Sequence, residues 1–305
     1  MSAASRSPAL HHEEHWAQKG EVRLFLWRKT MGEPCVGTIL FTHGSSMSGR
    51  PTFDLQVDGR PDLSAMNWFA ARGFDVWCVD LEGYGWSDKS RTINCDISNG
   101  ADDLFAATTY IREKTACGPL LIYGISSGAL RAALFAQRHP EHVARLALDA
   151  MVWTGKGSPT LEQRRKRLGE YSSMLRRPLD RAFVHSVFDR DHPGTAERSV
   201  IDAYADAILT YDDSVPTGSY VDMCSKLPIV DPRQIKPPTI IMRGELDGIA
   251  SFEDLQEFFA LLPNSDKTFA VMPGISHASF QQKNYAIVYH ILLDFFSRPV
   301  PVFSI

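Results

Sequence analysis

Short apolar runs alternate with longer amphipathic stretches over most of this chain. The apolar runs have the length and composition of β-strands; they are Val22–Arg28, Gly37–Thr42, Phe74–Val79, Leu120–Tyr123 and Val143–Leu148. The stretches between them have helical spacing; they are Ser64–Ala71, Asn99–Lys114 and Ser127–Arg138. Strands that alternate with helices in this way predict an α/β fold with a mainly parallel sheet.

The alternation stops between residues 152 and 236, where the sequence is polar, helical in pattern and contains no convincing strand. The alternation of strands and helices then resumes. Strands are predicted at Thr239–Met242 and Thr268–Met272, and helices at Phe252–Leu262 and Gln281–Ser297. We therefore predict an α/β core made of residues 21–151 and 237–305, interrupted by a helical insertion over residues 152–236. Residues 1–20 are polar and are predicted to form a loose N-terminal tail.

The pentapeptide Gly124-Ile125-Ser126-Ser127-Gly128 joins a predicted buried strand to a predicted helix. A G-x-S-x-G sequence in this strand–turn–helix context presents a serine hydroxyl for nucleophilic attack. So tight a turn requires small residues two positions before and after Ser126, and both are glycine. The N-terminus of the following helix favours negative charge at this point. We therefore predict that Ser126 is a nucleophile.

A candidate base and a candidate acid follow Ser126 along the chain. His277 lies after the last predicted strand, close behind Gly274, where a loop could reach Ser126. Asp247 follows the strand before it, and a carboxylate there could hold the histidine in the required tautomer. Asp149 and Glu245 are alternative acids, because each also lies near the end of a predicted strand.

Together these residues resemble the α/β-hydrolase superfamily, specifically its capped, lipase- and esterase-like branch. The resemblance covers residues 22–151 and 237–298 and includes the chain order Ser126, Asp247, His277. Two loops strengthen it: Phe41-Thr42-His43-Gly44-Ser45-Ser46 and Asp80-Leu81-Glu82-Gly83-Tyr84-Gly85-Trp86-Ser87. The second loop is similar to the D-x-x-G-x-G-x-S segment of that family, and we interpret its role as structural.

The resemblance implies an eight-stranded sheet with flanking helices and a helical cap inserted after the sixth strand. It also implies a Ser126–His277–Asp247 triad and an oxyanion hole made by the backbone N–H groups of Ser45 and Ser127. The reaction implied is hydrolysis of a carboxylic ester of a small organic molecule through an acyl-enzyme, without a metal or an organic cofactor.

A serine at the elbow argues against haloalkane dehalogenases and epoxide hydrolases, which use aspartate there. C–C bond hydrolases, amidases and lactonases remain alternatives, because the same triad serves all of them. A non-catalytic receptor for a small ligand on this fold is a further alternative.

Charge is unevenly distributed along the predicted insertion. Residues 152–182 carry eight basic and three acidic side chains, whereas residues 183–236 carry nine acidic and five basic ones. This pattern is typical of a solvated, salt-bridged helix face. A less favoured alternative is an arginine that binds the carboxylate of an aromatic or other acidic monoester. The residues predicted to contact substrate are Trp153, Ser46, Arg164 and Arg165.

Composition narrows the class of protein further. A hydrophobic content of 44% and a net charge of −4 indicate a folded globular chain without the basic surplus of a nucleic-acid binder. The apolar runs are too short to span a bilayer, and the N-terminus lacks the pattern of a signal peptide. The five cysteines include no C-x-x-C pair, which favours thiols in a reducing cytoplasm. We expect a cytoplasmic monomer or homodimer.

Residues His11-His12-Glu13-Glu14-His15 contain several groups that could ligate a metal. They fall in the predicted tail rather than on a helix that would fix their geometry, so we predict no metal site there. The loop Met47–Asp62 is long for a connection between a strand and a helix, and it is predicted to form a second wall of the pocket.

Overall fold

The computed structural model describes residues 9–32 and 35–302 of the chain. They form an eight-stranded sheet in the order β1, β2, β4, β3, β5, β6, β9, β10. In that order the strands span His11–Lys19, Val22–Thr30, Phe74–Val79, Gly37–Thr42, Leu120–Ile125, Val143–Asp149, Thr239–Gly244 and Lys267–Met272. The six strands β4, β3, β5, β6, β9 and β10 are parallel to one another. The strand β2 is antiparallel to its neighbours β1 and β4. The predicted α/β class and mainly parallel sheet are confirmed.

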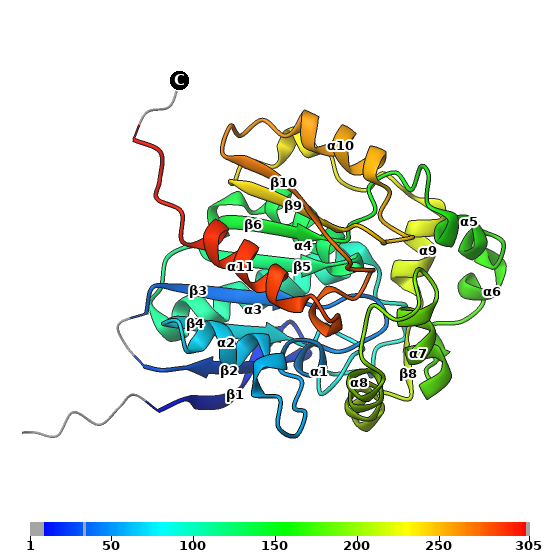
Figure 1. Cartoon of the computed structure of the whole chain (residues 1–305), viewed down its shortest axis with the longest axis horizontal. Helices are drawn as coiled ribbons and strands as arrows, with labels where there is room; N and C mark the ends of the chain where they lie inside the picture. Colours follow the sequence, from blue (N-terminus) through cyan, green and yellow to red (C-terminus); the bar gives the residue numbers. More distant parts are fainter. Residues whose placement is uncertain (1–8, 33–34, 303–305) are drawn as a thin grey trace, which may run out of the picture.

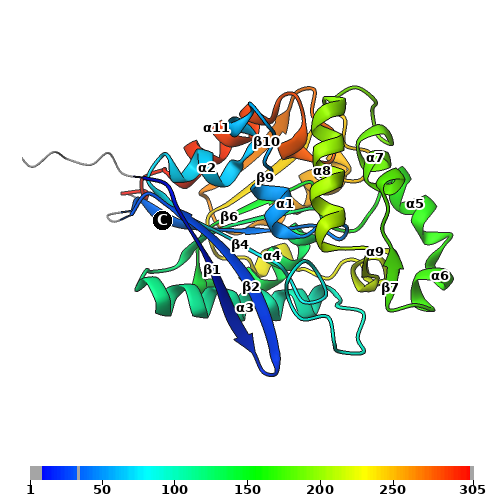
Figure 2. The same cartoon turned by 90° about the horizontal axis from the view of Figure 1, so that it is seen from below.

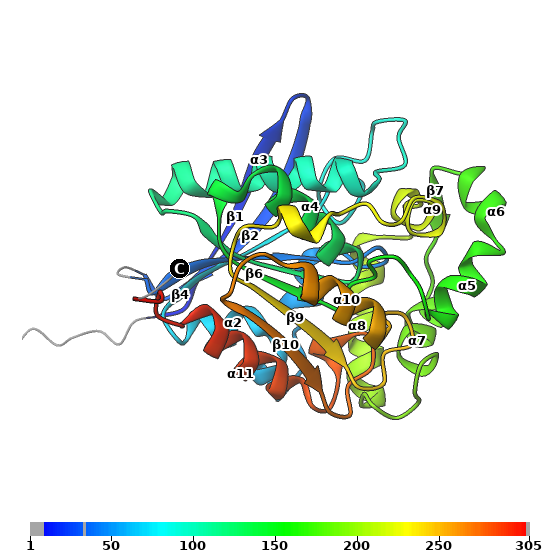
Figure 3. The same ribbon diagram turned by 90° about the horizontal axis from the view of Figure 1, so that it is seen from above.

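Helices cover both faces of this sheet (Figures 1 and 3). One face carries α2 (Ala65–Ala70) and α11 (Tyr285–Phe296), and the other carries α3 (Ile97–Thr115), α4 (Ser127–Arg138) and α10 (Phe252–Leu261). Short 3-10 helices lie in the connections, at Pro61–Leu63, Pro140–His142, Pro232–Gln234 and Ser279–Gln281. In the described part of the chain, no helix is both long and apolar enough to cross a membrane.

Two hydrophobic cores follow from the alternation of side chains along the strands. In β4, Val76 and Cys78 point into the core beneath α2 and α11, whereas Trp77 and Val79 point into the core beneath α3 and α4. All six residues of β4 are therefore buried. Strands that are covered on both faces have apolar residues at consecutive positions, which is why the sequence predicted them as continuous runs.

The prediction of a loose tail over residues 1–20 is wrong for His11–Lys19, which forms the edge strand β1. This strand pairs along its whole length with β2, and the two make the long hairpin seen in Figure 2. Only one side of β1 is covered: His15 and Ala17 are buried, and the residues between and beside them are exposed or partly exposed. Because one covered side needs few apolar residues, the segment was too polar to be recognised as a strand. Residues 1–8 lie outside the described residues.

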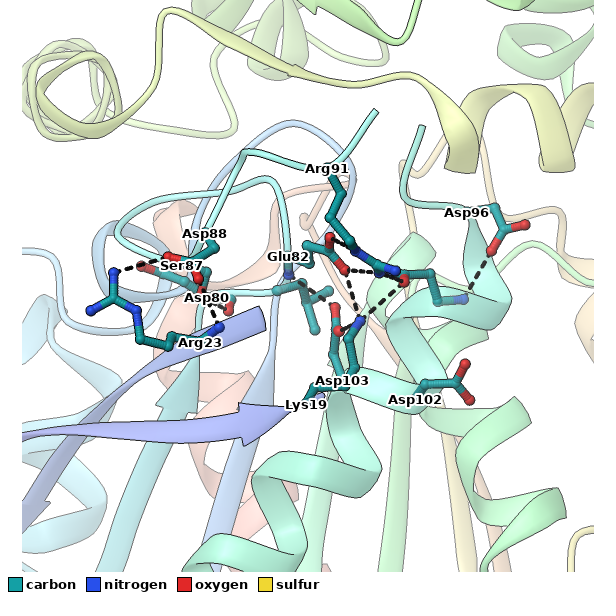
Figure 4. Close-up of polar contacts among 12 residues, drawn as sticks. Lys19, Arg23, Asp80, Glu82, Ser87, Asp88, Arg91, Asp96, Asp102 and Asp103 are labelled. Atoms are coloured by element: carbon teal, nitrogen blue, oxygen red, sulfur yellow. Dashed lines mark hydrogen bonds and ion pairs between the residues drawn. The ribbon is translucent and has the colours of Figure 1, made fainter. Parts of the chain in front are cut away.

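A network of charged residues fastens the end of β1 to the layer of helices (Figure 4). The Lys19 ammonium donates to Glu82 at 2.8 Å, to Asn99 at 3.0 Å and to Asp103. Arg91 also donates to both oxygens of Glu82, which is almost fully buried. These cations hold the pKa of Glu82 at about 2 against the opposing effect of burial. The network thus fixes the loop after β4 onto α3.

The segment between β6 and β9 is mainly helical, as predicted, and its helices gather at one end of the sheet (Figure 1). They are α5 (Pro159–Arg165), α6 (Leu168–Ser172), α7 (Arg181–Asp189), α8 (Arg198–Tyr211) and α9 (Gly218–Ser225). The prediction that this segment contains no strand is wrong, because β7 (Arg176–Pro178) pairs with β8 (Ser214–Pro216). Each strand has only three residues, which is too short for a periodic signal.

Candidate functional site

Ser126 lies in a sharp turn between β5 and α4. Its backbone has φ 58° and ψ −124°, a conformation that non-glycine residues rarely adopt. A Cβ added at Gly124 would lie 2.4 Å from the carbonyl oxygen of Gly128, and one added at Gly128 would lie 2.4 Å from that of His43. The two glycines are therefore required sterically, which is the reason that the sequence analysis gave for them.

A chain of hydrogen bonds joins Ser126, His277 and Asp247. The Oγ of Ser126 lies 2.9 Å from Nε2 of His277, and Nδ1 of His277 lies 3.0 Å from Oδ2 of Asp247. The other carboxylate oxygen of Asp247 accepts the backbone N–H groups of Ile249 and Ala250, at 2.7 and 3.0 Å. A carboxylate can only accept from Nδ1–H, so Nε2 of the neutral imidazole is left to accept the hydroxyl proton of Ser126.

Asp247 is fully enclosed, yet its surroundings favour the ionised form. Burial by itself raises the pKa of a carboxyl group. Here the charge and hydrogen bond of His277, together with the N–H groups of Ile249 and Ala250, outweigh burial and hold the pKa of Asp247 below its ordinary value. Asp247 is therefore prepared to offset positive charge on His277.

The two alternative acids lie elsewhere. Asp149 is buried and accepts the hydroxyl of Tyr123 at 2.6 Å, and its other oxygen has no hydrogen-bond partner among the described residues. Burial, with a further contribution from the charge of Asp247, raises the pKa of Asp149 to about 7. Glu245 is exposed and accepts the backbone N–H of Gly274 at 2.8 Å. Neither side chain is hydrogen-bonded to His277, whereas Asp247 is.

His43 fixes the loop that faces Ser126. Its Nε2 accepts the N–H of Leu81 at 3.1 Å, so its Nδ1–H is the donor to the carbonyl of Gly44, 2.8 Å away. Complete burial, helped by the nearby charge of Arg131, lowers the pKa of His43 to about 3 and keeps the ring neutral. His43 is thus a structural histidine, and it ties the loop after β3 to the loop after β4.

Ser45 and Ser127, the predicted oxyanion residues, contact each other beside Ser126. The Oγ of Ser45 donates to Oγ of Ser127 at 2.7 Å. The buried Arg131 donates to the same Ser127 oxygen at 3.3 Å, one turn further along α4. Ser127 begins α4, and the first N–H groups of a helix have no partner within the helix. Its N–H is therefore available to an atom bound next to Ser126.

The second loop of the resemblance has the structural role predicted for it. The carboxylate of Asp80 accepts the N–H groups of Gly49 at 2.7 Å and of Trp86 at 3.0 Å. Ser87 accepts the N–H of Phe25 at 2.8 Å and donates to the carbonyl of Asp80. These bonds hold the loop against β2 and α1 (Gly49–Phe53), and none of them involves Ser126.

A pocket opens over Ser126, and both the α/β core and the insertion line it. The core supplies Gly44, Ser45, Ser46, Met47, Thr52, Ile125, Ser126, His277, Ala278 and Gln281, and the insertion supplies Arg164, Val187, Arg190, Tyr204 and Tyr220. The loop predicted as a second pocket wall contributes Met47 and Thr52. The contact between Tyr204 and Thr52, at 3.0 Å between their hydroxyl oxygens, joins α8 to α1 at the rim.

Of the four residues predicted to contact substrate, Ser46 and Arg164 line this pocket, whereas Trp153 and Arg165 do not. The indole N–H of Trp153 donates to the carbonyl of Val230 at 3.0 Å, and its ring packs against Phe258 of α10. Arg165 is exposed on α5. Neighbouring residues on a helix point about 100° apart, which allows Arg164 to face the pocket while Arg165 points to solvent.

Tyr220 and Arg190 are pocket residues that the sequence analysis did not select. Tyr220 was one of many aromatic residues in the insertion, and nothing in its spacing separated it from a core residue. Arg177, which lies behind Tyr220 and Ser46, was likewise one of eight basic residues without a distinguishing pattern. Which of these side chains converge on the pocket depends on how the helices of the insertion pack.

Within the described residues, no group of three or more histidine, cysteine or acidic side chains is arranged to hold a metal ion. The run from His11 to His15, which the sequence analysis did not assign to a metal, lies on β1. There His15 contacts Glu13 at 2.8 Å and the hydroxyl of Tyr110 at 3.0 Å.

Comparison with known proteins places the chain in a family. The family model described as serine aminopeptidase, S33, matches residues 63–284, more than half of the chain. The chain belongs to this family of α/β hydrolases. A plant relative, the alpha/beta hydrolase domain-containing protein VTE7 of Arabidopsis thaliana, is 33% identical over 75 residues, which are 24% of this chain and 21% of that protein.

Solved structures share the fold over nearly the whole chain. An esterase from Thermogutta terrifontis is 19% identical with a TM-score of 0.63, and the match covers 93% of this chain and 97% of that one. E-2-(acetamidomethylene)succinate hydrolase is 20% identical with a TM-score of 0.67, and the match covers 94% of this chain and all of that one. At such low identity these structures establish the fold alone.

Proposed function

We propose that this hydrolase cleaves a carboxylic ester of a small organic molecule, with Ser126 as nucleophile. The observation that carries the proposal is the continuous hydrogen-bonded chain from Ser126 through His277 to Asp247 at the floor of a pocket. Membership of the S33 α/β-hydrolase family and the esterase among the structural neighbours support it. The particular substrate and the triad itself are parts of the proposal.

In the proposed reaction, His277 takes the proton of Ser126 as Oγ attacks the ester carbonyl carbon. The tetrahedral oxyanion accepts N–H groups from Ser45 and Ser127, and Asp247 offsets the positive charge on the imidazolium. His277 then protonates the departing alcohol as the C–O bond breaks and leaves an acyl-enzyme on Ser126. Water, deprotonated by the same histidine, attacks the acyl group and releases the acid and the free serine.

The residues around the pocket favour a small ester with an aromatic or carboxylate-bearing group. Tyr204 and Tyr220 provide aromatic surface, and Arg164 provides a positive charge. The same triad would also cleave an amide, a lactone or a C–C bond next to a carbonyl. Assays with such substrates beside the esters distinguish these alternatives. The cytoplasmic location and the oligomeric state expected from the sequence stay predictions.

The test compares wild type with Ser126→Ala on short p-nitrophenyl esters. We expect the variant to lose about 10⁴-fold or more in kcat/KM, since removal of the nucleophile of such a triad has effects of this size. A fluorophosphonate should add once to wild type and not to Ser126→Ala, as measured by intact mass. Circular dichroism and the melting temperature of the variant confirm that it is folded.

Two results would contradict the proposal. Equal turnover by wild type and a folded Ser126→Ala variant would show that the reaction does not use this serine. A wild type that neither turns over esters nor takes up the fluorophosphonate would favour the non-catalytic receptor.

A further inference from the structure

The guanidinium of Arg164 has no hydrogen bond or ion pair with any residue in the described part of the chain. Arg164 is partly buried on α5 and lines the pocket above Ser126. Its guanidinium carbon lies 4.4 Å from the centre of the Tyr220 ring. Burial lowers the pKa of Arg164, as expected of a cation that is partly stripped of water.

A second arginine, Arg177, also lies against Tyr220 and has no acidic partner among the described residues. It is 6% exposed, and its guanidinium carbon is also 4.4 Å from the centre of the Tyr220 ring. Its Nη2 donates to Oγ of Ser46 at 2.7 Å, and its Nε has no hydrogen-bond partner among the residues described. Two cations thus lie against one phenol, whereas Arg190, which also lines the pocket, is paired with Asp191 at 2.9 Å.

The other basic residues of the same stretch behave as a solvated helix face would. Arg181 pairs with Asp202 and Asp206, Arg167 pairs with Glu170 at 2.7 Å, and Lys156 pairs with Glu257 at 3.4 Å. Arg176 donates to the backbone carbonyls of Gly83 and Ser214, and Arg165 and Lys166 are exposed. The acidic half of the insertion therefore neutralises part of the basic half and leaves the two arginines beside the pocket uncompensated.

Tyr220 lines the pocket, and its ring lies beside both arginines. Its hydroxyl oxygen lies 3.4 Å from Oγ of Ser46, the residue after the proposed oxyanion donor Ser45. Burial by itself would raise the pKa of Tyr220, but the charges of Arg164, Arg177 and Arg190 and the contact with Ser46 lower it to about 7. The ring of Tyr171 packs edge-on at 5.2 Å and completes the surroundings. Positive charge at this point is thus strong enough to favour an anion.

We propose that Arg164 and the hydroxyl of Tyr220 bind a carboxylate of the substrate, with Arg177 behind them as a second positive charge. The inference rests on the proposed function, since it names the substrate class of the same pocket. The substrate is then an ester that also carries a free carboxylate, such as a half-ester of a dicarboxylic acid. An arginine and a phenol donate to a carboxylate with charge assistance, and the apolar Met47 and Val187 surround the remainder of the molecule.

The first test measures kcat/KM for monomethyl glutarate and for its neutral counterpart, dimethyl glutarate. We expect wild type to prefer the half-ester. In Arg164→Gln the ratio of the two kcat/KM values should fall by roughly 10–100-fold, because a hydrogen bond to a charged group contributes about 1.5–3 kcal/mol. Arg165→Gln is the matched control, since it removes an exposed arginine from the same helix and should leave the ratio unchanged.

The second test measures the binding of glutarate to a variant that lacks the proposed nucleophile. Ser126→Ala is titrated with glutarate at about pH 8, and the near-ultraviolet absorbance of the Tyr220 phenolate is followed. A carboxylate beside Arg164 offsets the charge that lowers the pKa of Tyr220, so that pKa should rise and the phenolate signal should fall. Tyr220→Phe should lack the signal, and Arg164→Gln should bind glutarate about tenfold or more weakly by calorimetry.

The outcomes separate this inference from the proposed function. If neutral esters are cleaved through Ser126 but wild type shows no preference for the half-ester, the carboxylate site is overturned and the esterase stands. If no ester is cleaved, glutarate binding and the phenolate change still test the site. Absence of both at millimolar glutarate would overturn it. Inorganic phosphate is titrated in parallel, and a stronger response to phosphate than to glutarate would contradict the choice of carboxylate.

Discussion

The two sides of the pocket differ in how their charged groups are satisfied. On the core side, Ser126, His277 and Asp247 contact one another, and the acid is further held by backbone N–H groups. On the side of the insertion, Arg164 and Arg177 have aromatic and neutral neighbours and no acid. A protein tolerates a charge without a partner at some cost in stability, and such groups are concentrated where a ligand supplies the partner.

Under the proposed function, the core side carries out the chemistry and the insertion side sets the selectivity. The core side is complete without a substrate, so a change there should lower the rate for every ester by the same factor. The insertion side is completed by the substrate, so a change there should act on one class of ester only.

The largest effect is expected from Asp247, the acid of the proposed triad. Asp247→Asn should lower kcat by about 10⁴-fold, equally for the half-ester and the diester, because the amide favours the wrong tautomer of His277. Asp149→Asn should change kcat less than about tenfold, since Asp149 is not hydrogen-bonded to His277. The reverse order of the two variants would show that Asp149 is the functional acid.

A smaller effect is expected from His43, which orients the loop of Ser45. His43→Phe keeps the aromatic contact with Tyr84 but leaves the Gly44 carbonyl and the Leu81 N–H without their partners. If the Ser45 N–H is displaced, kcat should fall by about 10²–10³-fold, which is the usual value of one oxyanion donor. The loss should be the same for both esters, with KM little changed.

A His43→Phe variant that is folded and retains full kcat would show that the loop does not depend on this ring. A loss confined to the half-ester would contradict the division between the two sides of the pocket. The melting temperature of the variant separates a displaced loop from a destabilised protein.

The smallest effect concerns stability and pH. A free carboxyl of this type titrates near pH 3.8, whereas the pKa of Asp149 in the folded protein is about 7, beside Tyr123, Ser279, Asp247 and His277. Between about pH 4 and pH 7 the folded chain therefore holds a proton that the unfolded chain has lost, so raising the pH through this range lowers the free energy of unfolding. Asp149→Asn removes this contribution.

The melting temperature should thus fall less between pH 5 and pH 8 in Asp149→Asn than in wild type. Asp80, which is also buried and has a pKa raised to about 6, contributes in the same direction in both proteins and cancels in the comparison. Parallel curves for the two proteins would show that Asp149 is ionised in the fold throughout this range.

Local patterns predicted most of the sheet and the position of the candidate nucleophile. The strand Gly37–Thr42 and the helix Ser127–Arg138 have the predicted bounds, because continuous apolar runs and a following Pro140 are local signals. The edge strand β1 was missed because only His15 and Ala17 on one side of it are buried. Its stability comes from pairing with β2 and from contacts with α3, which no local pattern records.

In the candidate site, too, some features were predictable from local sequence and others depend on tertiary contacts. Gly124 and Gly128 predicted the tight turn at Ser126, because a Cβ at either glycine would collide with the backbone. Asp247 was predicted as the acid, and spacing alone left Asp149 and Glu245 open because each also lies near the end of a strand. In the fold the N–H of Leu246 donates to the carbonyl of Ile275 at 2.9 Å, which brings Asp247 beside His277.

The α/β class and the strand–turn–helix elbow at Ser126 followed from the sequence alone, because they depend on periodicity and on the sterics of a few neighbouring positions. Only the tertiary structure decided that Arg164 faces the pocket while Arg165 faces solvent, and that Trp153 packs against α10. The direction of a side chain on a short helix is set by the packing of α5 against α9 and the core, which brings together residues far apart in the chain.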